Sequence, residues 1–275
     1  MRFVRAGVVM IFILSLVIFG VSRVVLFQNR DPNEPEIVSD REILEIPCEY
    51  TQEQLLEGLT ASDQEDGDLT SQIVAGSFSR FIEPGLCNMT YVVFDSADQP
   101  ASLTRQVRFT DYHSPRFTLT EPLVFSEGEG SYDELMGRLG AQDQLDGDLS
   151  DWITQTDTDV NYQRAGSYTT TLEMSNSLGD TVTQDLPIHV VAAEGHSLEI
   201  VLNTGIVYID QGSGIDAAAY IQELLDNQGN NLDTSLISSE SNVDPQTPGC
   251  YEVHYQAEDG QGNSGETWLT VIVEG

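Results

Sequence analysis

The chain has 275 residues, of which 45 are acidic and only 11 are basic, so its formal net charge at pH 7 is −34. All the basic residues are arginine, and none follows Arg164. Such a surface repels the phosphates of nucleic acids and of anionic lipids, which argues against a role in binding either. It attracts cations, although a surface that serves only solubility or adaptation to salt would have the same composition.

The N-terminal segment is apolar. Residues 6–27 contain no charged side chain except Arg23, and about twenty apolar positions are enough for a helix to cross a bilayer. Arg23 lies near the far end of the stretch, where a long side chain can reach the lipid headgroups. Arg2 and Arg5 precede the stretch, which favours an N-terminus inside the cell. Residues 1–30 are therefore expected to form a short cytoplasmic stub and a signal-anchor transmembrane helix.

A cleaved signal peptide is the alternative interpretation of this segment. Gly20 and Ser22 are small enough for a cleavage site, after which the chain would be secreted. The apolar run continues past Arg23, which favours the uncleaved anchor. Both interpretations place the residues after about Asn29 outside the cytoplasm.

The rest of the chain repeats one block three times. Each copy has an acidic segment, a glycine 22 or 23 residues after its first aspartate, and an Asp or Asn ten residues after that glycine. These landmarks are Asp63, Gly85 and Asp95, then Asp143, Gly166 and Asn176, then Asp226, Gly249 and Asp259. Three landmarks that keep their spacing indicate an array of one module. The expected modules are residues 33–111, 112–193 and 194–275.

Each copy ends with the pattern of two β-strands. In the third copy, apolar and polar residues alternate over Tyr251–Glu258, and Thr267–Val273 closes the module. Such alternation is typical of a strand with one buried face. Each copy also opens with short strand-like runs, which are Glu42–Ile46, Phe117–Thr120 with Leu123–Phe125, and Leu198–Leu202. This density of short strands predicts an all-β fold with one sandwich in each copy.

A stretch with another spacing lies between the opening and closing strands. Apolar residues fall at i, i+1 and i+4 over Gln52–Leu59, Tyr132–Leu139 and Ala217–Leu224. This spacing predicts a short amphipathic helix over one end of each sandwich, although Gly58 and Gly137 weaken it.

These motifs resemble a known family. The acidic segments Asp63–Thr70 and Asp143–Ser150, together with Pro248–Asn263, are similar to the bacterial immunoglobulin-like domain first described in pesticidal crystal toxins and common in Gram-positive surface proteins. The match is weaker at Asp226–Leu232, where Gly229 and Asn231 replace acidic residues, and the first module departs from it at Cys87 and at Asp98–Gln99. The resemblance implies three tandem immunoglobulin-like sandwiches, extracellular placement and a binding or spacer role. It implies no particular ligand.

The acidic segments are the sharpest candidates for chemistry. Three carboxylates around a glycine suit calcium, which takes six to eight oxygen ligands in a flexible shell. The candidate ligands are Asp63, Asp66 and Asp68 in the first module, and Asp143, Asp146 and Asp148 in the second. Downstream Asp95 or Asn176 would complete the shell if the fold brings it near. The alternative is structural, because Asp-Gly forms tight turns and the last aspartate can cap a helical turn. The third copy is expected to bind weakly or not at all.

The three cysteines suggest one disulfide. Cys48 and Cys87 both lie in the first module, and Cys87 takes the place of Tyr168 and Tyr251, so it is expected to point into the sandwich. A Cys48–Cys87 bond would stabilise that module by roughly 3–4 kcal/mol. Cys250 has no partner in its own module and is either a buried thiol or a site of intermolecular pairing.

Catalysis has little support in the sequence. His113 and His196 are isolated at the module joints, whereas His189 and His254 alternate with apolar residues and are expected to face solvent. No nucleophile elbow or phosphate-binding loop occurs. No cofactor other than calcium is indicated, and the protein is not expected to be an enzyme.

Four aromatic residues raise a further alternative. If they lie together, these side chains line a sugar- or peptide-binding surface, and otherwise they pack in the core or at the module joints. The residues are Trp152, Trp268, Tyr112 and Phe117.

The sequence thus predicts a membrane-anchored extracellular array for binding, adhesion or presentation, with another envelope protein or a surface glycan as partner. A passive spacer is the alternative, and a cell-surface hydrolase is the least favoured.

Overall fold

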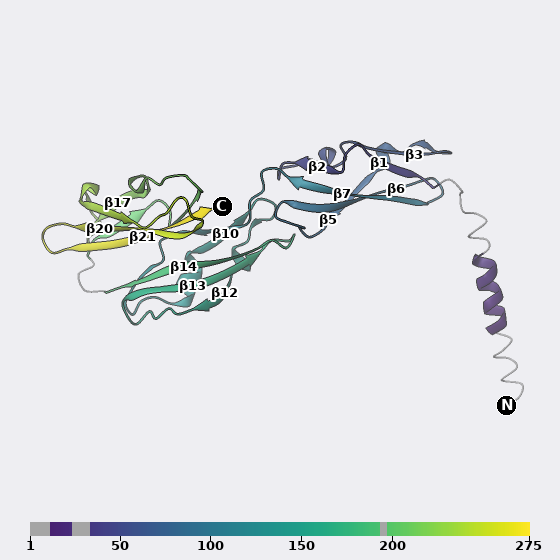
Figure 1. Cartoon of the computed structure of the whole chain (residues 1–275). Helices are drawn as coiled ribbons and strands as arrows, with labels where there is room; N and C mark the ends of the chain where they lie inside the picture. Colours follow the sequence, from purple (N-terminus) through teal and green to yellow (C-terminus); the bar gives the residue numbers. More distant parts are fainter. Residues whose placement is uncertain (1–11, 24–33, 193–196) are drawn as a thin grey trace, which may run out of the picture. The chain divides into compact units, whose positions relative to one another are not determined.

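The computed structural model of the protein describes residues 12–23, 34–192 and 197–275. The chain divides into two compact units, Met1–Thr110 and Asp111–Gly275. The described strands form three similar modules, each with a three-stranded and a four-stranded sheet (Figure 1). The first module lies in the first unit, and the second unit holds the other two. The predicted all-β sandwich architecture is confirmed.

The modules contain corresponding elements in the same order, except that the third has a 3-10 turn where the others have an α-helix. The first has β1 (Glu36–Ser39), β2 (Ile43–Ile46), α2 (Gln52–Leu55), β3 (Leu59–Asp63), β4 (Gly67–Asp68), η1 (Thr70–Gln72), β5 (Val74–Phe78), β6 (Leu86–Phe94) and β7 (Pro100–Phe109). The second has β8 (Arg116–Leu119), β9 (Val124–Ser126), α3 (Tyr132–Arg138), β10 (Leu139–Asp143), β11 (Gly147–Asp148), η2 (Ser150–Trp152), β12 (Thr154–Thr158), β13 (Gly166–Ser175) and β14 (Thr181–Val191). The third has β15 (Glu199–Leu202), β16 (Ile206–Asp210), η3 (Ala217–Tyr220), β17 (Ile221–Leu225), β18 (Asn231–Leu232), η4 (Thr234–Leu236), β19 (Ile237–Ser241), β20 (Gly249–Glu258) and β21 (Ser264–Glu274).

The sheets have one topology in all three modules. The sheet orders are β1-β3-β4 with β2-β7-β6-β5, β11-β10-β8 with β12-β13-β14-β9, and β15-β17-β18 with β16-β21-β20-β19. The opening segment of each module contributes an antiparallel strand to the smaller sheet, then crosses and pairs in parallel with the last strand of the larger sheet. Each opening segment therefore ties the two sheets of its sandwich together.

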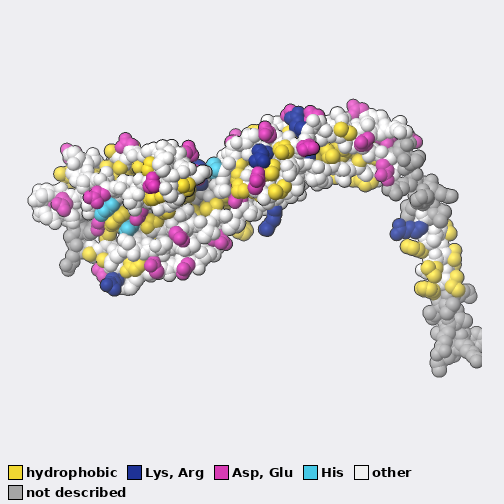
Figure 2. Space-filling view, in the orientation of Figure 1, with side chains coloured by type: hydrophobic (Ala, Val, Ile, Leu, Met, Phe, Trp, Pro, Cys, Tyr) yellow, Lys and Arg dark blue, Asp and Glu magenta, His cyan; other side chains and the backbone are white. Residues whose placement is uncertain are grey.

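The closing strands follow the predicted alternation. In β20, Val253, Tyr255 and Ala257 are buried and alternate with more exposed residues. Tyr91, Leu172 and Tyr255 are fully buried. Each lies four residues before the Asp or Asn landmark of its module, which is Asp95, Asn176 or Asp259. The same position is thus fully buried in the core of every module. Acidic side chains are spread over the exposed surface and outnumber the basic ones on the face seen in Figure 2.

The helical prediction is only partly right. α2 and α3 form where they were expected, but α2 is a single turn. The predicted helix Ala217–Leu224 is wrong, because only Ala217–Tyr220 forms a 3-10 turn and the following residues enter β17. In the first two modules the last leucine of the pattern likewise begins a strand. Pairing with the opening strand of the smaller sheet therefore overrides the helical spacing.

The N-terminal segment is described only in part. Residues 12–23 are helical, and their large apolar side chains are exposed, Phe12 by 64% and Leu14 by 60%. Among the described residues, no helix is both long and apolar enough to span a membrane. The predicted span, residues 6–27, lies partly outside the described residues, and the transmembrane prediction is not supported by the structure.

Both cysteines of the first module are buried. Cys87 is a thiol whose Sγ lies 3.8 Å from the carbonyl oxygen of Val107, and burial raises its pKa to about 11. The predicted Cys48–Cys87 bond is therefore not formed in this structure. Its formation under oxidising conditions stays a prediction.

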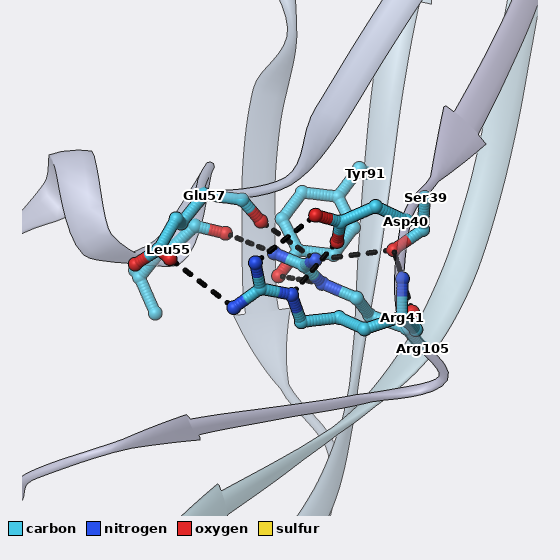
Figure 3. Close-up of polar contacts among 7 residues, drawn as sticks. All are labelled: Ser39, Asp40, Arg41, Leu55, Glu57, Tyr91 and Arg105. Carbon is cyan, nitrogen blue, oxygen red and sulfur yellow. Dashed lines mark hydrogen bonds and ion pairs between the residues drawn. The ribbon is translucent and has the colours of Figure 1, made fainter.

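The core of the first module contains a buried cation. Arg105 is only 4% exposed, and its guanidinium lies against the ring of Tyr91 (Figure 3). Its nitrogens donate to the carbonyl oxygens of Leu55 at 2.9 Å and Glu57 at 2.8 Å, and to the hydroxyl of Ser39 at 3.2 Å. These carbonyls end the α2 turn, where unpaired acceptors and the helix dipole favour a positive charge. Arg105 therefore joins α2 to both sheets.

The other modules carry leucine at this position. Arg105 pairs with Met89, six residues before Asp95, and the corresponding residues of β14 and β21 are Leu186 and Leu269. Both leucines are fully buried.

Arg105→Ala is expected to lower the free energy of unfolding of the first module by about 3 kcal/mol, because it leaves a cavity and removes the donors to two carbonyls. Arg105→Leu fills the volume as in the other modules and is expected to lower stability by less. Urea unfolding followed by circular dichroism measures both. An equal loss of unfolding free energy in the two variants would show that the volume of the side chain at position 105 does not affect stability.

Candidate functional site

The acidic segment of the first module is a tight loop between β3 and β4. Asp63 ends β3, and its Oδ1 accepts hydrogen bonds from the N–H groups of Glu65 at 2.7 Å and Asp66 at 2.9 Å. The bond from Asp66, followed by that from Glu65, lowers the pKa of Asp63 below its ordinary value. Gly67 has a φ of 74°, a conformation that favours glycine. Asp63 is therefore a turn former in this loop.

The other two carboxylates of the loop bind different parts of the backbone. Asp68 accepts a bond from the N–H of Thr70 at 2.9 Å, and Asp66 accepts one from Ser96 at 2.7 Å. Within the described residues, no group of three or more His, Cys, Asp or Glu is arranged to hold a metal. The structure thus does not bring Asp63, Asp66 and Asp68 together as one set of ligands. Calcium binding by this module stays a prediction.

The second module repeats the arrangement. Oδ1 of Asp143 accepts bonds from Leu145 at 2.8 Å and Asp146 at 2.9 Å. Asp146 in turn accepts bonds from the N–H and the hydroxyl of Ser177, and Asp148 accepts a bond from the N–H of Ser150. The candidates Asp143, Asp146 and Asp148 therefore also bind separate backbone segments. Both loops have the turn-forming structure that was the alternative to calcium.

The fold does bring the downstream residue against the leading aspartate. Nδ2 of Asn176 donates to Oδ2 of Asp143 at 3.2 Å and lies 2.9 Å from the hydroxyl of Tyr112. That hydroxyl donates to Asp180 at 2.7 Å. Burial, followed by the bond to Asp180, raises the pKa of Tyr112. The side-chain amide of Asn176 thus supplies the hydrogen-bond donor for the buried oxygen of Asp143.

The third module uses two amides instead. Asn230 donates through Nδ2 to Oδ2 of Asp226 at 3.0 Å, and Asn263 donates through Nδ2 to Asp259. Each carboxylate also accepts backbone bonds through Oδ1.

A second group of chemically active side chains lies where the second and third modules meet. The ring of His189, on β14, stacks on Trp268, on β21, with centroids 3.9 Å apart and planes 8° apart. His254 also stacks on Trp268, at 4.1 Å and 5°. Nε2 of His189 lies 2.6 Å from Oε1 of Glu252, and Nε2 of His254 lies 2.8 Å from Oε2 of Glu266. We call these five residues the His–Trp stack.

The solvent-facing prediction for these histidines is wrong, since His189 is only 6% exposed and His254 is half-buried. Both do point away from their own sandwiches, as the alternation predicted. However, the outer face of β14 meets that of β21, so the two outward faces bury one another's side chains.

Apolar packing continues across this joint. Ile206 and Ile272 of the third module are buried in the hydrophobic core of the second, and Cys250 packs against it. Burial, followed by the charge of Glu252, raises the pKa of Cys250 to about 12. Cys250 is a half-buried thiol in this structure, and its pairing with another chain stays a prediction. The hydroxyl of Tyr208 accepts a bond from the N–H of Phe117 at 2.8 Å.

A cleft of about 510 Å³ opens beside these contacts. Arg116 and Tyr208 line it, and Arg116 binds Glu274 there by an ion pair. Gly205 approaches the second module so closely that a Cβ atom would lie 2.7 Å from the carbonyl oxygen of Glu121. The two modules thus fit together through backbone contact as well as side chains.

The predicted aromatic surface is not assembled. Phe117 is fully buried, Tyr112 is held by hydrogen bonds, and Trp268 belongs to the His–Trp stack. Trp152 is different, because 70% of it is exposed. It lines a cleft of about 330 Å³ with Asp146, Asp148, Leu149, Ser175, Asn176 and Ser177.

The chain is similar to bacterial surface domains. Residues 195–273 match the family described as a bacterial surface protein Ig-like domain. The chain is 25% identical over 224 residues to pesticidal crystal protein Cry22Aa of Bacillus thuringiensis, covering 79% of this chain and 30% of that protein. An uncharacterized 81.3 kDa protein of Acholeplasma phage L2 is 28% identical over 142 residues, which are 51% of this chain and 19% of that one. The predicted family resemblance is confirmed, and the chain spans less than a third of either relative.

Solved structures resemble the chain only distantly. CBM51-2 in complex with GlcNAc and INT domains from Clostridium perfringens ZmpB has a TM-score of 0.24 at 18% identity, covering 60% of this chain and 31% of that one. The lipoprotein BT2262 from Bacteroides thetaiotaomicron has a TM-score of 0.21 at 14% identity, covering 86% and 98%. Such scores carry no argument about function. None of the comparisons gives positive evidence of enzymatic activity.

Asp148→Asn is expected to lower the thermal midpoint at neutral pH. The hydroxyl and N–H of Ser150 lower the pKa of Asp148, so its stabilising effect is present above the unfolded pKa and is lost as pH falls through the folded pKa. The difference from the wild type is therefore expected to vanish below about pH 3. Thermal unfolding at several pH values measures it, with Asp151→Asn on the same turn as the control. A difference that persists in acid would show that Asp148 acts through shape alone.

His189→Ala and Trp268→Ala are expected to be coupled by about 0.5–1.5 kcal/mol, because each removes one ring of the same stack. A double-mutant cycle on the unfolding of the second unit measures this coupling. The matched cycle of His189→Ala with the exposed Trp152→Ala is expected to be additive. Additivity in both cycles would show that the stack does not stabilise the joint.

Proposed function

Because the third module belongs to the bacterial surface immunoglobulin-like family, we propose that the protein is a non-catalytic array that binds a glycan at the cell surface. The repeated sandwich is the observation that carries this proposal, since the same sheets recur in the first two modules. Such sandwiches commonly place binding residues on the loops at their ends, which a rigid framework positions.

The N-terminal helix supports attachment to the membrane. Every described side chain of residues 12–23 is exposed, and the apolar ones are more than half exposed. Burying this much apolar surface in lipid removes it from water, which is strongly favourable. In the proposed arrangement the segment anchors the chain in the membrane, and the modules lie outside the cell.

Trp152 is the proposed contact for the ligand. Its exposed indole offers an apolar face with a polar edge, and tryptophan is frequent among the residues that dominate binding. The neighbouring carboxylates of Asp146 and Asp148 are hydrogen-bond acceptors for hydroxyl groups. A flat apolar face beside acceptors suits a sugar ring with its hydroxyls. The first and third modules have Gln72 and Leu236 at this position, so the second module alone carries the site.

A passive spacer is the second candidate. The continuous core and the His–Trp stack between the second and third modules favour it, since they restrict motion at that joint. A spacer requires such stiffness but requires no exposed aromatic residue.

Bacterial cells that express the full chain test the proposal. Labelled glycans from bacterial envelopes are expected to bind these cells, and Trp152→Ala is expected to weaken binding by about thirtyfold, a typical effect of losing a dominant contact. Tyr132→Ala, which removes another exposed aromatic ring, is the matched control and is expected to bind normally. Antibody against the third module measures display at the surface.

Several results would contradict it. Equal glycan binding by Trp152→Ala would place the site elsewhere, and normal display without binding of any glycan would favour the spacer. A chain found shortened in the medium would show that the N-terminal segment is a cleaved signal peptide.

A further inference from the structure

One substitution distinguishes the first module from the second at the end of the sandwich. In the second module, the amide of Asn176 donates to the buried Oδ2 of Asp143 at 3.2 Å. The residue that corresponds to Asn176 in the first module is Asp95, and Asp63 corresponds to Asp143. In the first module a carboxylate therefore replaces the amide that donates a hydrogen bond to the leading aspartate.

The backbone around this position is the same in both modules. Oδ1 of Asp95 accepts bonds from the N–H groups two and four residues further on, at 2.9 and 2.7 Å. Oδ1 of Asn176 accepts the same two bonds, at 3.1 and 2.9 Å. Asp63 likewise repeats both backbone bonds of Asp143. The second oxygens of Asp63 and Asp95 consequently take the places of the bonded pair in the second module.

These two oxygens are buried without donors. Asp63 is 9% exposed and Asp95 is 6% exposed. Among the described residues, neither Oδ2 atom has a hydrogen-bond partner. The third module avoids this situation with the amides of Asn230 and Asn263. An unpaired charge in such a place is strongly unfavourable, so a positive partner is required.

We propose that Asp63 and Asp95 together bind a divalent cation of the calcium class. Two buried carboxylate oxygens are hard ligands of the kind that calcium prefers, with water and backbone oxygens completing the shell. Each Oδ1 already accepts two backbone hydrogen bonds, so the two Oδ2 atoms are the oxygens left for the cation. The chain has no lysine to supply the charge.

This site differs from the three-carboxylate loop that the sequence suggested. It joins the β3–β4 loop to the β6–β7 loop, so that the cation ties two loops together. Few protein ligands predict weak binding, with Kd of about 10⁻⁴–10⁻³ M, as in extracellular calcium modules. The second module lacks the site because Asn176 already fills it.

Asp95→Asn is the decisive variant, because it gives the first module the hydrogen bond that the second module has. Calcium chloride is titrated into the full-length chain in detergent, and binding and the thermal midpoint are measured. The wild type is expected to bind one calcium ion and to gain stability with it. Asp95→Asn is expected to lose this binding and to exceed the wild type in stability when a chelator is present. Asn176→Asp, the reciprocal change, is expected to add a second calcium site.

Other results would overturn the proposal. Unchanged calcium binding in Asp95→Asn would place the ion elsewhere. No binding by the wild type, with an acid-induced rise in its thermal midpoint that Asp95→Asn lacks, would show that the pair shares a proton. Because Asp95→Asn restores an arrangement already present in this chain, it is expected to fold, and Asp151→Asn controls for the loss of a surface charge.

Discussion

The twin hydrogen bonds of the leading aspartate are the constraint on which each module depends. Asp63, Asp143 and Asp226 each use one oxygen to hold two backbone N–H groups, which turns the chain sharply at the end of a strand. In the second and third modules an asparagine amide donates to the second oxygen, whereas in the first that oxygen has no hydrogen-bond partner among the described residues. The modules therefore differ in how this second oxygen is bonded. The loop is thus a fixed scaffold on which one neighbouring residue decides the local chemistry.

Much of this fold could be predicted from the sequence. The spacing of the repeat predicts three modules. The alternation over Tyr251–Glu258 predicts the closing strands, because a strand with one buried face has a period of two. The shortest strands could not be found in this way. Gly67–Asp68 forms β4 by pairing across a tight turn with the end of β3, and two residues are too few to show an alternation. The helix predicted over Ala217–Leu224 is wrong for another reason: its second half pairs with β15, which lies far away in the chain, and such pairing leaves no local pattern.

The sites were harder to predict than the fold. The sequence grouped the aspartates of each loop by proximity along the chain. In the structure they bond instead to the next loop, Asp66 to Ser96, 30 residues away, and Asp143 to Asn176, 33 residues away. The alternation predicts that His189 and His254 face solvent, because a strand pattern cannot show that two outward faces meet. One signal was available, since Asn176 and Asp95 occupy the same landmark with different charge. Comparing the copies position by position would have exposed the unmatched carboxylate.

The two tryptophans of the chain occupy opposite environments. Trp152 is open to solvent, whereas Trp268 lies against two imidazole rings. The emission of an indole shifts to longer wavelength when its surroundings become polar, so it reports on what covers the ring. The protein therefore contains two intrinsic optical reporters, one for its exposed surface and one for the closure of a module joint. Opening of the joint would change the surroundings of Trp268 and leave those of Trp152 unchanged, so a single spectrum could follow the joint without any attached dye.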